Sequence, residues 1–204
     1  MTKVNEAEKQ LFKIKQQVER CKKCNLSKTR IKAVAGEGSF LTKIIFIGEA
    51  PGKNEDHQGR PFVGRAGKLL DELLQFIGLE RKQIFITNIL KCRPPKNRNP
   101  LKNEIKMCTY FLDEQIELIK PKIIVSLGNY ASTYLLNKYN IAEEKIGDVH
   151  GKVFCLDEHS FKTILIPIYH PAAAVYNPNL KEILKQDFKS IDEALLNISK
   201  KKFP

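Results

Sequence analysis

The stretch 43–64 carries the densest group of residues that could do chemistry. An apolar run at 44–47, IIFI, is typical of a buried strand, and it ends at the turn sequence GEAPG, which cannot continue a strand. Glu49 lies on that turn, Glu55 follows it, and Phe62 lies in a second glycine-bounded loop, GRPFVG. Polar residues on loops after a buried strand are typical of active sites in open α/β sheets. We therefore expect these two loops to form a wall of an active site.

Two more polar residues come just after predicted strands. Asn88 follows the apolar run IFIT, and His170 comes just after the run TILIPI. Because parallel strands end at the same edge of a sheet, Glu49, Asn88 and His170 are expected to lie together. An asparagine amide suits the edge of a nucleobase, and a histidine can donate to an oxygen that gains negative charge. Asn88 and His170 could instead have purely structural roles. The asparagine could stabilise a turn by hydrogen bonds, and the histidine could be an ordinary loop residue.

The apolar patterns predict an α/β fold. Four strands are expected at 44–47, 84–87, 123–127 and 163–168. Helices are expected at 5–20, 65–77, 100–119, 128–137 and 179–198. Each strand is a continuous apolar run, which is typical of a parallel sheet covered by helices on both faces. The segment 28–43 is expected to be irregular, and 140–163 to be irregular or a small hairpin.

Length and composition favour one domain with an anionic partner. The chain has 204 residues and a formal net charge of +12, which favours nucleic acid. A basic protein without such a partner, or one rich in lysine for stability at high temperature, would show the same charge. We see no apolar run of membrane-spanning length and no signal peptide, so we expect a cytoplasmic protein without a membrane partner. Motifs for nucleoside triphosphates and dinucleotides are missing.

Four of the 5 cysteines could hold a metal centre. Cys21 and Cys24 form a C-x2-C pair, and Cys92 and Cys108 follow later in the chain. In a reducing compartment such a set indicates metal ligation or free thiols rather than disulfides. Four thiolates suit either zinc or a [4Fe–4S] cluster, and the spacing leaves that choice open. Cys108 could instead be a small core residue, and Cys155, within an apolar run, is expected to be structural.

Taken together, these motifs resemble those of the iron–sulfur, type 4 uracil-DNA glycosylases. The resemblance rests on the four cysteines, the GEAPG and GRPFVG loops, the segment TNILKCRPP, Asn97 and the HPAA sequence that begins at His170. It implies a three-layer α/β/α sandwich with a central four-stranded parallel sheet. It also implies a [4Fe–4S] cluster on Cys21, Cys24, Cys92 and Cys108.

The implied reaction is hydrolysis of the N-glycosidic bond of deoxyuridine in single- or double-stranded DNA, which leaves an abasic site for base excision repair. The flipped uracil would stack on Phe62. Asn88 would donate to uracil O4 and accept from N3–H, and Glu55 would exclude the methyl group of thymine. His170 would hydrogen-bond O2 of the leaving uracil anion.

The group that activates the attacking water is not named by these motifs. Better-known uracil glycosylases carry an aspartate at the position of Ala50, where the resemblance also implies a contact with the base. Glu49, Glu55 or backbone carbonyls must then position the water, and the resemblance implicates Asn97. We rank Glu49 first because it lies on the strand-end turn itself.

We expect residues 1–204 to form a single monomeric domain, with the helix and cysteine pair of 1–42 packed onto it and a frayed tail at 199–204. Val175 or Tyr176 would fill the space that the flipped base leaves. Phosphate contacts are expected from Lys22, Lys23, Lys91, Arg93 and Arg98.

Two other functions stay open on the sequence alone. One is a non-catalytic nucleic-acid-binding module stabilised by a cluster, and the other is an iron–sulfur redox protein. The first gives no reason for Glu49, Asn88 and His170 to meet at one sheet edge.

Overall fold

The computed structural model describes residues 3–39, 41–141, 145–156 and 161–200. In these residues six strands form one sheet, in the order β1–β3–β2–β4–β6–β5. The strands are β1 (Glu37–Gly38), β2 (Ile44–Gly48), β3 (Phe85–Asn88), β4 (Ile123–Leu127), β5 (Phe154–Leu156) and β6 (Thr163–Ile168). The four central strands run parallel, and β1 and β5 add antiparallel at the two edges.

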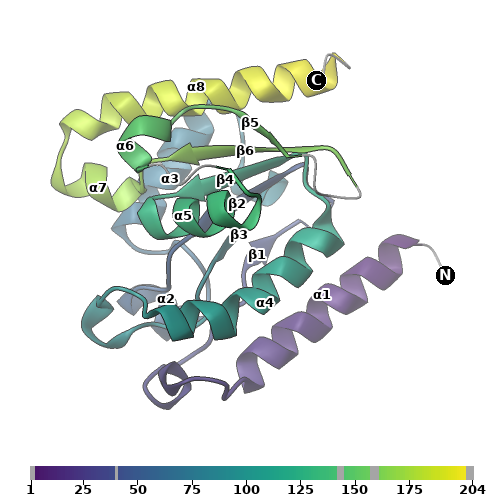
Figure 1. The fold of residues 1–204 in the computed structure, drawn as a ribbon, viewed down its shortest axis with the longest axis vertical. Coiled ribbons are helices and arrows are strands. Elements are labelled where there is room, and N and C mark those ends of the chain that lie inside the picture. The colour runs from purple at the N-terminus through teal and green to yellow at the C-terminus, as the bar shows by residue number, and fades with distance from the viewer. Residues whose placement is uncertain (1–2, 40, 142–144, 157–160, 201–204) are drawn as a thin grey trace.

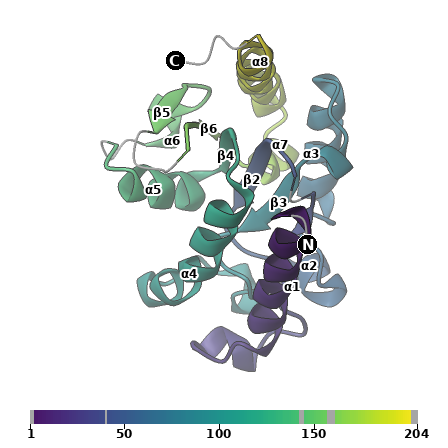
Figure 2. The ribbon, with the colours of Figure 1, turned by 90° about the vertical axis from the view of Figure 1, so that its right-hand side faces the viewer.

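Helices cover both faces of this sheet (Figures 1 and 2). They are α1 (Lys3–Arg20), α2 (Lys53–Gln58), α3 (Arg65–Phe76), α4 (Lys102–Ile119), α5 (Asn129–Lys138), α6 (Ile146–Val149), α7 (Pro171–Tyr176) and α8 (Asn179–Ser199). Short 3-10 turns lie at Asn25–Lys28, Arg81–Gln83 and Pro95–Asn97. Helices α1, α4 and α5 lie on one face, and α3 and α8 lie on the other.

The strands are apolar throughout because both of their faces are buried. In β2, Ile45 and Ile47 belong to the core shared with α1, α4 and α5. Ile44 and Phe46 belong to the second core, with α3 and α8. Since successive side chains of a strand point to opposite faces, one apolar run supplies both cores.

The predicted α/β fold is confirmed, but the expected number of strands is wrong. The structure has two further strands, β1 and β5, at the edges of the sheet. β1 is only two residues long, too short to show an apolar pattern, and β5 lies within 140–163, where a small hairpin was one expectation. The short helices α2 and α7 lie in strand-end loops and were also missed. Of the tail expected to fray, Ser199 ends α8, and 201–204 lie outside the described residues.

The N-terminal helix joins the main core. Ile14 and Val18 of α1 are buried in the same cluster as Leu112 and Ile116 of α4. None of the helices in the described part of the chain combines the length and apolar character needed to cross a membrane.

Helix α3 begins against the loop that carries Phe62. Gly64 is its N-cap, and Gly67 lies in its first turn. A Cβ atom at Gly67 would lie 1.8 Å from the carbonyl oxygen of Phe62, so no larger residue fits without moving that loop.

This contact predicts that Gly67→Ala destabilises the protein by about 1–3 kcal/mol, the usual cost of overpacking a tight contact. The matched control is Gly147→Ala in α6, where the new Cβ would lie 3.6 Å from the Tyr169 hydroxyl, an ordinary contact. Chemical denaturation of the two variants measures the difference. Equal midpoints for both would contradict the proposed clash.

Candidate active site

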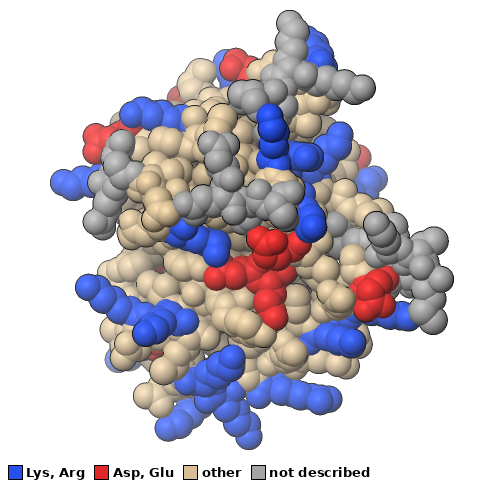
Figure 3. All heavy atoms as spheres, turned by 45° about the vertical axis from the view of Figure 1, so that its right-hand side comes forward, with Lys and Arg blue, Asp and Glu red and all other residues tan. Residues whose placement is uncertain are grey.

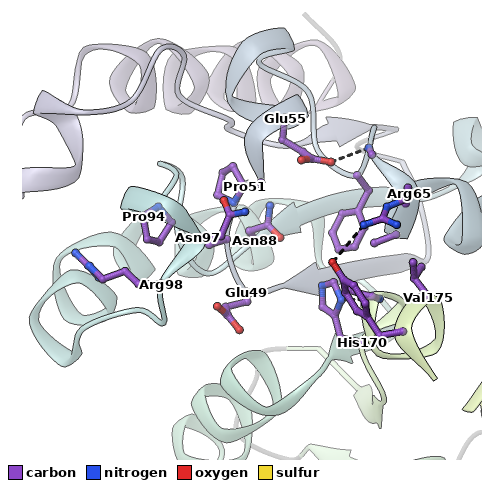
Figure 4. A pocket seen from close by; sticks show the side chains of 17 residues that line it. Glu49, Pro51, Glu55, Arg65, Asn88, Pro94, Asn97, Arg98, His170 and Val175 are labelled. Atoms are coloured by element: carbon purple, nitrogen blue, oxygen red, sulfur yellow. Dashed lines mark hydrogen bonds between the residues drawn. The ribbon is translucent and has the colours of Figure 1, made fainter.

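A cavity of about 490 Å³ opens at the carboxyl ends of the parallel strands (Figure 4). This volume lies within the range of about 300–1,000 Å³ that is usual for small-ligand sites. All seven residues expected to act on the base or the water line it: Glu49, Ala50, Glu55, Phe62, Asn88, Asn97 and His170. Parallel strands and their loops therefore bring together side chains that are far apart in the sequence.

The ends of β2 and β3 lie side by side in this cavity. Gly48 pairs with Asn88 in the parallel ladder. Beyond the ladder, the amide of Ile89 donates to the carbonyl of Gly48 (2.9 Å), and the amide of Leu90 donates to that of Glu49 (3.0 Å). The turn that carries Glu49 is thus fixed to the segment after Asn88.

Glycine at position 48 permits a close approach of three elements. A Cβ atom there would lie 2.5 Å from Asn88 Oδ1 and 2.6 Å from Cζ of Phe62. Only a residue without a side chain allows both groups to occupy the strand end.

Asn88 presents a polar group that the protein leaves without a partner. The residue is 2% exposed, and its Oδ1 is buried without a hydrogen bond from the described residues. Buried polar atoms are nearly always paired, so an unpaired one at a cavity indicates a ligand-binding group.

The loop that carries Phe62 is held in an unusual conformation. Phe62 has φ of 51°, in the left-handed region that non-glycine residues rarely adopt. The guanidinium of Arg81 donates to the carbonyls of Pro61 and Phe62, and Glu37 and Asp71 in turn accept from Arg81. Sequence reasoning missed Arg81, because nothing in its local sequence points to a loop 20 residues earlier.

Glu55 fixes the same loop from the other side. Its carboxylate accepts hydrogen bonds from the amides of Val63 and Gly64, both at 2.9 Å. The side chain lines the cavity beside Phe62, but one of its oxygens is already used to position the loop.

The geometry of His170 determines which ring nitrogen carries the proton. Nδ1 accepts a hydrogen bond from the amide of Ala172 at 3.0 Å, so a neutral ring carries its proton on Nε2. Burial lowers the pKa of His170 from 6.5 to about 4, and the charge of Glu55 offsets this only partly. The ring stacks on Phe62 with 5.6 Å between centroids. A neutral Nε2–H donor is therefore available at the cavity near pH 7.

The other expected groups differ in how they are held. Burial raises the pKa of Glu49, with no hydrogen bond from the described residues to offset it. Asn97 is exposed, has φ of 55°, and accepts a hydrogen bond from Arg93 Nε at 2.7 Å. Ala50 lines the cavity and brings no polar side-chain atom.

Two of the residues expected to bind phosphate, Lys91 and Arg98, have other partners in the structure. Lys91 is 1% exposed, so the expectation that it contacts phosphate is wrong. Arg98 lines the cavity, but its guanidinium already forms two hydrogen bonds with Glu104, at 2.6 and 2.9 Å. Lys23 lies over the ring of Tyr110 (4.6 Å), and Lys22 is exposed.

Positive charge is scattered over the face of the molecule in Figure 3. The face in Figure 3 carries scattered Lys and Arg side chains around a patch of acidic ones. On this face the charge forms no single basic stripe.

Two more residues shape the rim of the cavity. Arg65, at the start of α3, donates to the hydroxyl of Tyr176 at 3.3 Å, and its guanidinium lies 5.5 Å from that ring. Tyr176 is 77% exposed. Arg65 was not singled out in the sequence, although its place at a helix start after the GRPFVG loop could have indicated it.

The four cysteines that were expected as ligands line one small cavity. Arg30 Nη1 donates to Cys92 Sγ (2.9 Å), and the amide of Lys91 donates to Cys108 Sγ (3.1 Å). Burial raises the pKa of Cys92, and it raises that of Cys108 to about 12. Among the described residues, no three His, Cys, Asp or Glu side chains are arranged to hold a single metal ion. Cys155 is exposed on β5, while its neighbour Leu156 is buried, so Cys155 is not the buried structural residue that its apolar run suggested.

Comparisons with known proteins agree with this geometry. Residues 35–195 match the family model of the Uracil DNA glycosylase superfamily. The chain is 49% identical over 183 residues to a type-4 uracil-DNA glycosylase of Saccharolobus solfataricus, with 89% of this chain and 85% of that protein covered. It is 52% identical over 184 residues to the type-4 uracil-DNA glycosylase of Sulfurisphaera tokodaii, and this match covers 90% of this chain and 84% of that protein. It is 47% identical over 173 residues to the type-4 uracil-DNA glycosylase of Archaeoglobus fulgidus, and this match covers 85% of this chain and 87% of that protein. The resemblance inferred from the motifs is confirmed, and the chain belongs to the uracil DNA glycosylase superfamily.

Proposed function

We propose that this protein hydrolyses the N-glycosidic bond of deoxyuridine in DNA, releasing uracil and leaving an abasic site for base excision repair. Its type-4 uracil-DNA glycosylase relatives match most of the chain. The observation that carries the proposal is the unpaired Oδ1 of Asn88, in a cavity that also holds an aromatic ring and a neutral imidazole. A flipped base would give that buried acceptor its missing donor.

Asn88 is the group that reads the base. Uracil presents O4 as an acceptor and N3–H as a donor, and one carboxamide matches both. Cytosine reverses the two groups, so buried polar atoms would be left unmatched, which discriminates strongly. Stacking on Phe62 contributes about 1–3 kcal/mol toward the few kcal/mol that flipping the base costs. Glu55, which lines the cavity, would exclude the methyl group of thymine.

His170 stabilises the leaving group. As the bond to the sugar breaks, negative charge develops on uracil O2, and Nε2–H of the neutral imidazole donates to it. The amide of Ala172 holds the ring in the required tautomer. One such donor is typically worth about 10²–10³ in rate.

The attacking water is positioned by Glu49. The carboxylate is half-buried at the cavity, and Ala50 beside it offers no base. A carboxylate there also favours the positive charge that develops on the sugar. Asn97, on the loop after β3, would assist with its amide, although its oxygen is shared with Arg93.

Tyr176 is the residue whose side chain enters the gap that the flipped base leaves in the base stack of the DNA. It is exposed at the rim and is supported by Arg65. Val175, its neighbour on α7, is partly buried in the cavity wall and reaches less far. Of the five basic residues expected to bind DNA phosphates, only Lys91 is buried, and the exposed Lys22 and Lys23 are the ones free of a hydrogen bond to another described side chain.

The proposed occupant of the cysteine site is a [4Fe–4S] cluster rather than zinc. The choice rests on the resemblance to the type-4 uracil-DNA glycosylases, because four thiolates can hold either group. In a cluster each thiolate binds a different iron, so four sulfurs around one small cavity are consistent with it. Cys21, Cys24, Cys92 and Cys108 would hold the cluster, which would cross-link the end of α1 to the loop after β3 and to α4.

We further propose a single-domain monomer that acts in a reducing compartment such as the cytoplasm. All 5 cysteines are free rather than joined in disulfides. Cysteines remain available as thiolate ligands in compartments where thiols stay reduced.

Asn88→Ala and His170→Ala are expected to slow single-turnover excision from a uracil-containing oligonucleotide by about 10²–10³ each. Binding of the same DNA should change far less, because phosphate contacts supply most of it. Alkali treatment reveals the abasic site as a strand break. The exposed Asn197→Ala on α8 is the control. Equal loss of excision and binding would instead mean that these residues organise the fold.

The His170 ring is expected to be neutral, with its proton on Nε2, from pH 8 down to about pH 5, given its pKa of about 4. Because this pKa lies below the unfolded value of 6.5, His170 contributes most to stability above pH 6.5, and the contribution is lost as pH falls toward 4. Nitrogen-15 NMR of the ring, assigned by comparison with His170→Ala, measures the tautomer and the pKa, and denaturation of the two proteins between about pH 4 and pH 8 measures the contribution to stability. A ring that titrates near pH 6.5 would rule out the neutral donor.

Cys108→Ser is expected to abolish the visible absorbance of an iron–sulfur cluster and to lower the melting temperature. Cys155→Ser, which changes an exposed cysteine outside the cavity, should leave both unchanged. Iron and zinc contents of the purified proteins complete the test. Stoichiometric zinc without iron in the wild-type protein would refute the cluster.

A further inference from the structure

Lys91 is a buried lysine whose side-chain nitrogen has a complete set of hydrogen-bond partners. Its side chain is 1% exposed. Nζ donates to Thr87 Oγ1 at 2.6 Å, to the backbone carbonyl of Asn88 at 2.8 Å and to Gln115 Oε1 at 2.8 Å. An ammonium has three N–H groups, and each of them finds an acceptor.

These acceptors connect three segments of the chain. Thr87 and Asn88 end β3, and Gln115 lies in α4. Thr87 Oγ1 and Gln115 Nε2 both donate to the carbonyl of Ala35, at 3.0 and 2.7 Å. The Lys91 side chain therefore ties the end of β3 to α4, and Thr87 and Gln115 join this link to the segment before β1.

The backbone of Lys91 faces the cysteine site. Its amide donates to Cys108 Sγ, and Cys92 is the next residue in the chain. One residue thus contacts the cysteine site through its amide and the carbonyl of Asn88 through its ammonium.

Asn88 needs such an anchor. No described residue hydrogen-bonds to its Oδ1, so the direction of the amide depends on where the end of β3 lies relative to Gly48. An amide that could rotate would suit cytosine as well as uracil. Lys91 holds the carbonyl of the same residue, only a few bonds from that amide.

We propose that Lys91 is a positioning residue that holds the end of β3 against the cysteine site and thereby sets the base specificity of Asn88. This inference rests on the proposed uracil excision. On this proposal the cysteine site affects base specificity indirectly, because Lys91 links it to Asn88.

The test compares Lys91→Met with Lys106→Met. The first keeps the length of the side chain and removes all three donors, whereas the second removes one exposed charge from α4. Lys91→Met is expected to slow uracil excision by about 10–100-fold, as for other residues that support a ligand group. The ratio of uracil to cytosine excision should fall by about tenfold or more, because the amide is freer to rotate. Lys106→Met should leave both values as in the wild type.

A second measurement does not depend on activity. The side-chain NH₂ signals of Asn88, assigned by their loss in Asn88→Ala, should shift or broaden in Lys91→Met and stay unchanged in Lys106→Met. If Lys91→Met does not fold, Lys91→Met/Gln115→Met serves instead, because replacing both members of a buried polar pair is better tolerated than replacing one.

The possible outcomes separate this inference from the proposed function. Uracil and cytosine excision that fall by the same factor, or Asn88 signals that do not change, would overturn the role of Lys91. A wild-type protein that excises no uracil would refute the proposed function, and the role in specificity that rests on it would fall with it.

Discussion

The close approach of β2 and β3 at their carboxyl ends is the contact on which the rest of the site depends. Gly48 pairs with Asn88, and a Cβ at Gly48 would collide with both Asn88 Oδ1 and the ring of Phe62. A missing side chain at one position therefore lets an amide and an aromatic ring share one small volume. The turn with Glu49 follows directly, so the carboxylate is brought to the same place.

Around this contact, the protein holds its functional groups in position before any ligand is bound. The Glu55 carboxylate and the Arg81 guanidinium fix the Phe62 loop from two sides. The amide of Ala172 sets the tautomer of His170. Groups that are already oriented need little rearrangement during the reaction, which is how such sites stabilise developing charge. The left-handed conformation of Phe62 persists because these bonds over-determine it.

The cysteine site lies on the other side of the loop after β3. In the arrangement we propose, its role is mechanical: it adds a cross-link between the end of α1, the loop after β3 and α4, of which α1 and α4 already share the main core. Lys91 extends this support to the base-reading residue. Burial lowers the pKa of Lys91 to about 7, and its three hydrogen-bond acceptors satisfy every donor of the ammonium form.

The α/β fold, the four parallel strands and the residues that meet at their carboxyl ends could be predicted from the sequence, because continuous apolar runs and strand-end glycines are local signals. The sequence could not reveal that Lys91 is buried, that Arg81 holds the Phe62 loop, or that β1 and β5 extend the sheet. The charge of Lys91 looks the same on a surface as in a core, and an edge strand of two residues has no pattern. These features appear only in the folded protein, because each depends on partners far away in the sequence. The protonation of His170 was likewise decided by burial and by the amide of Ala172.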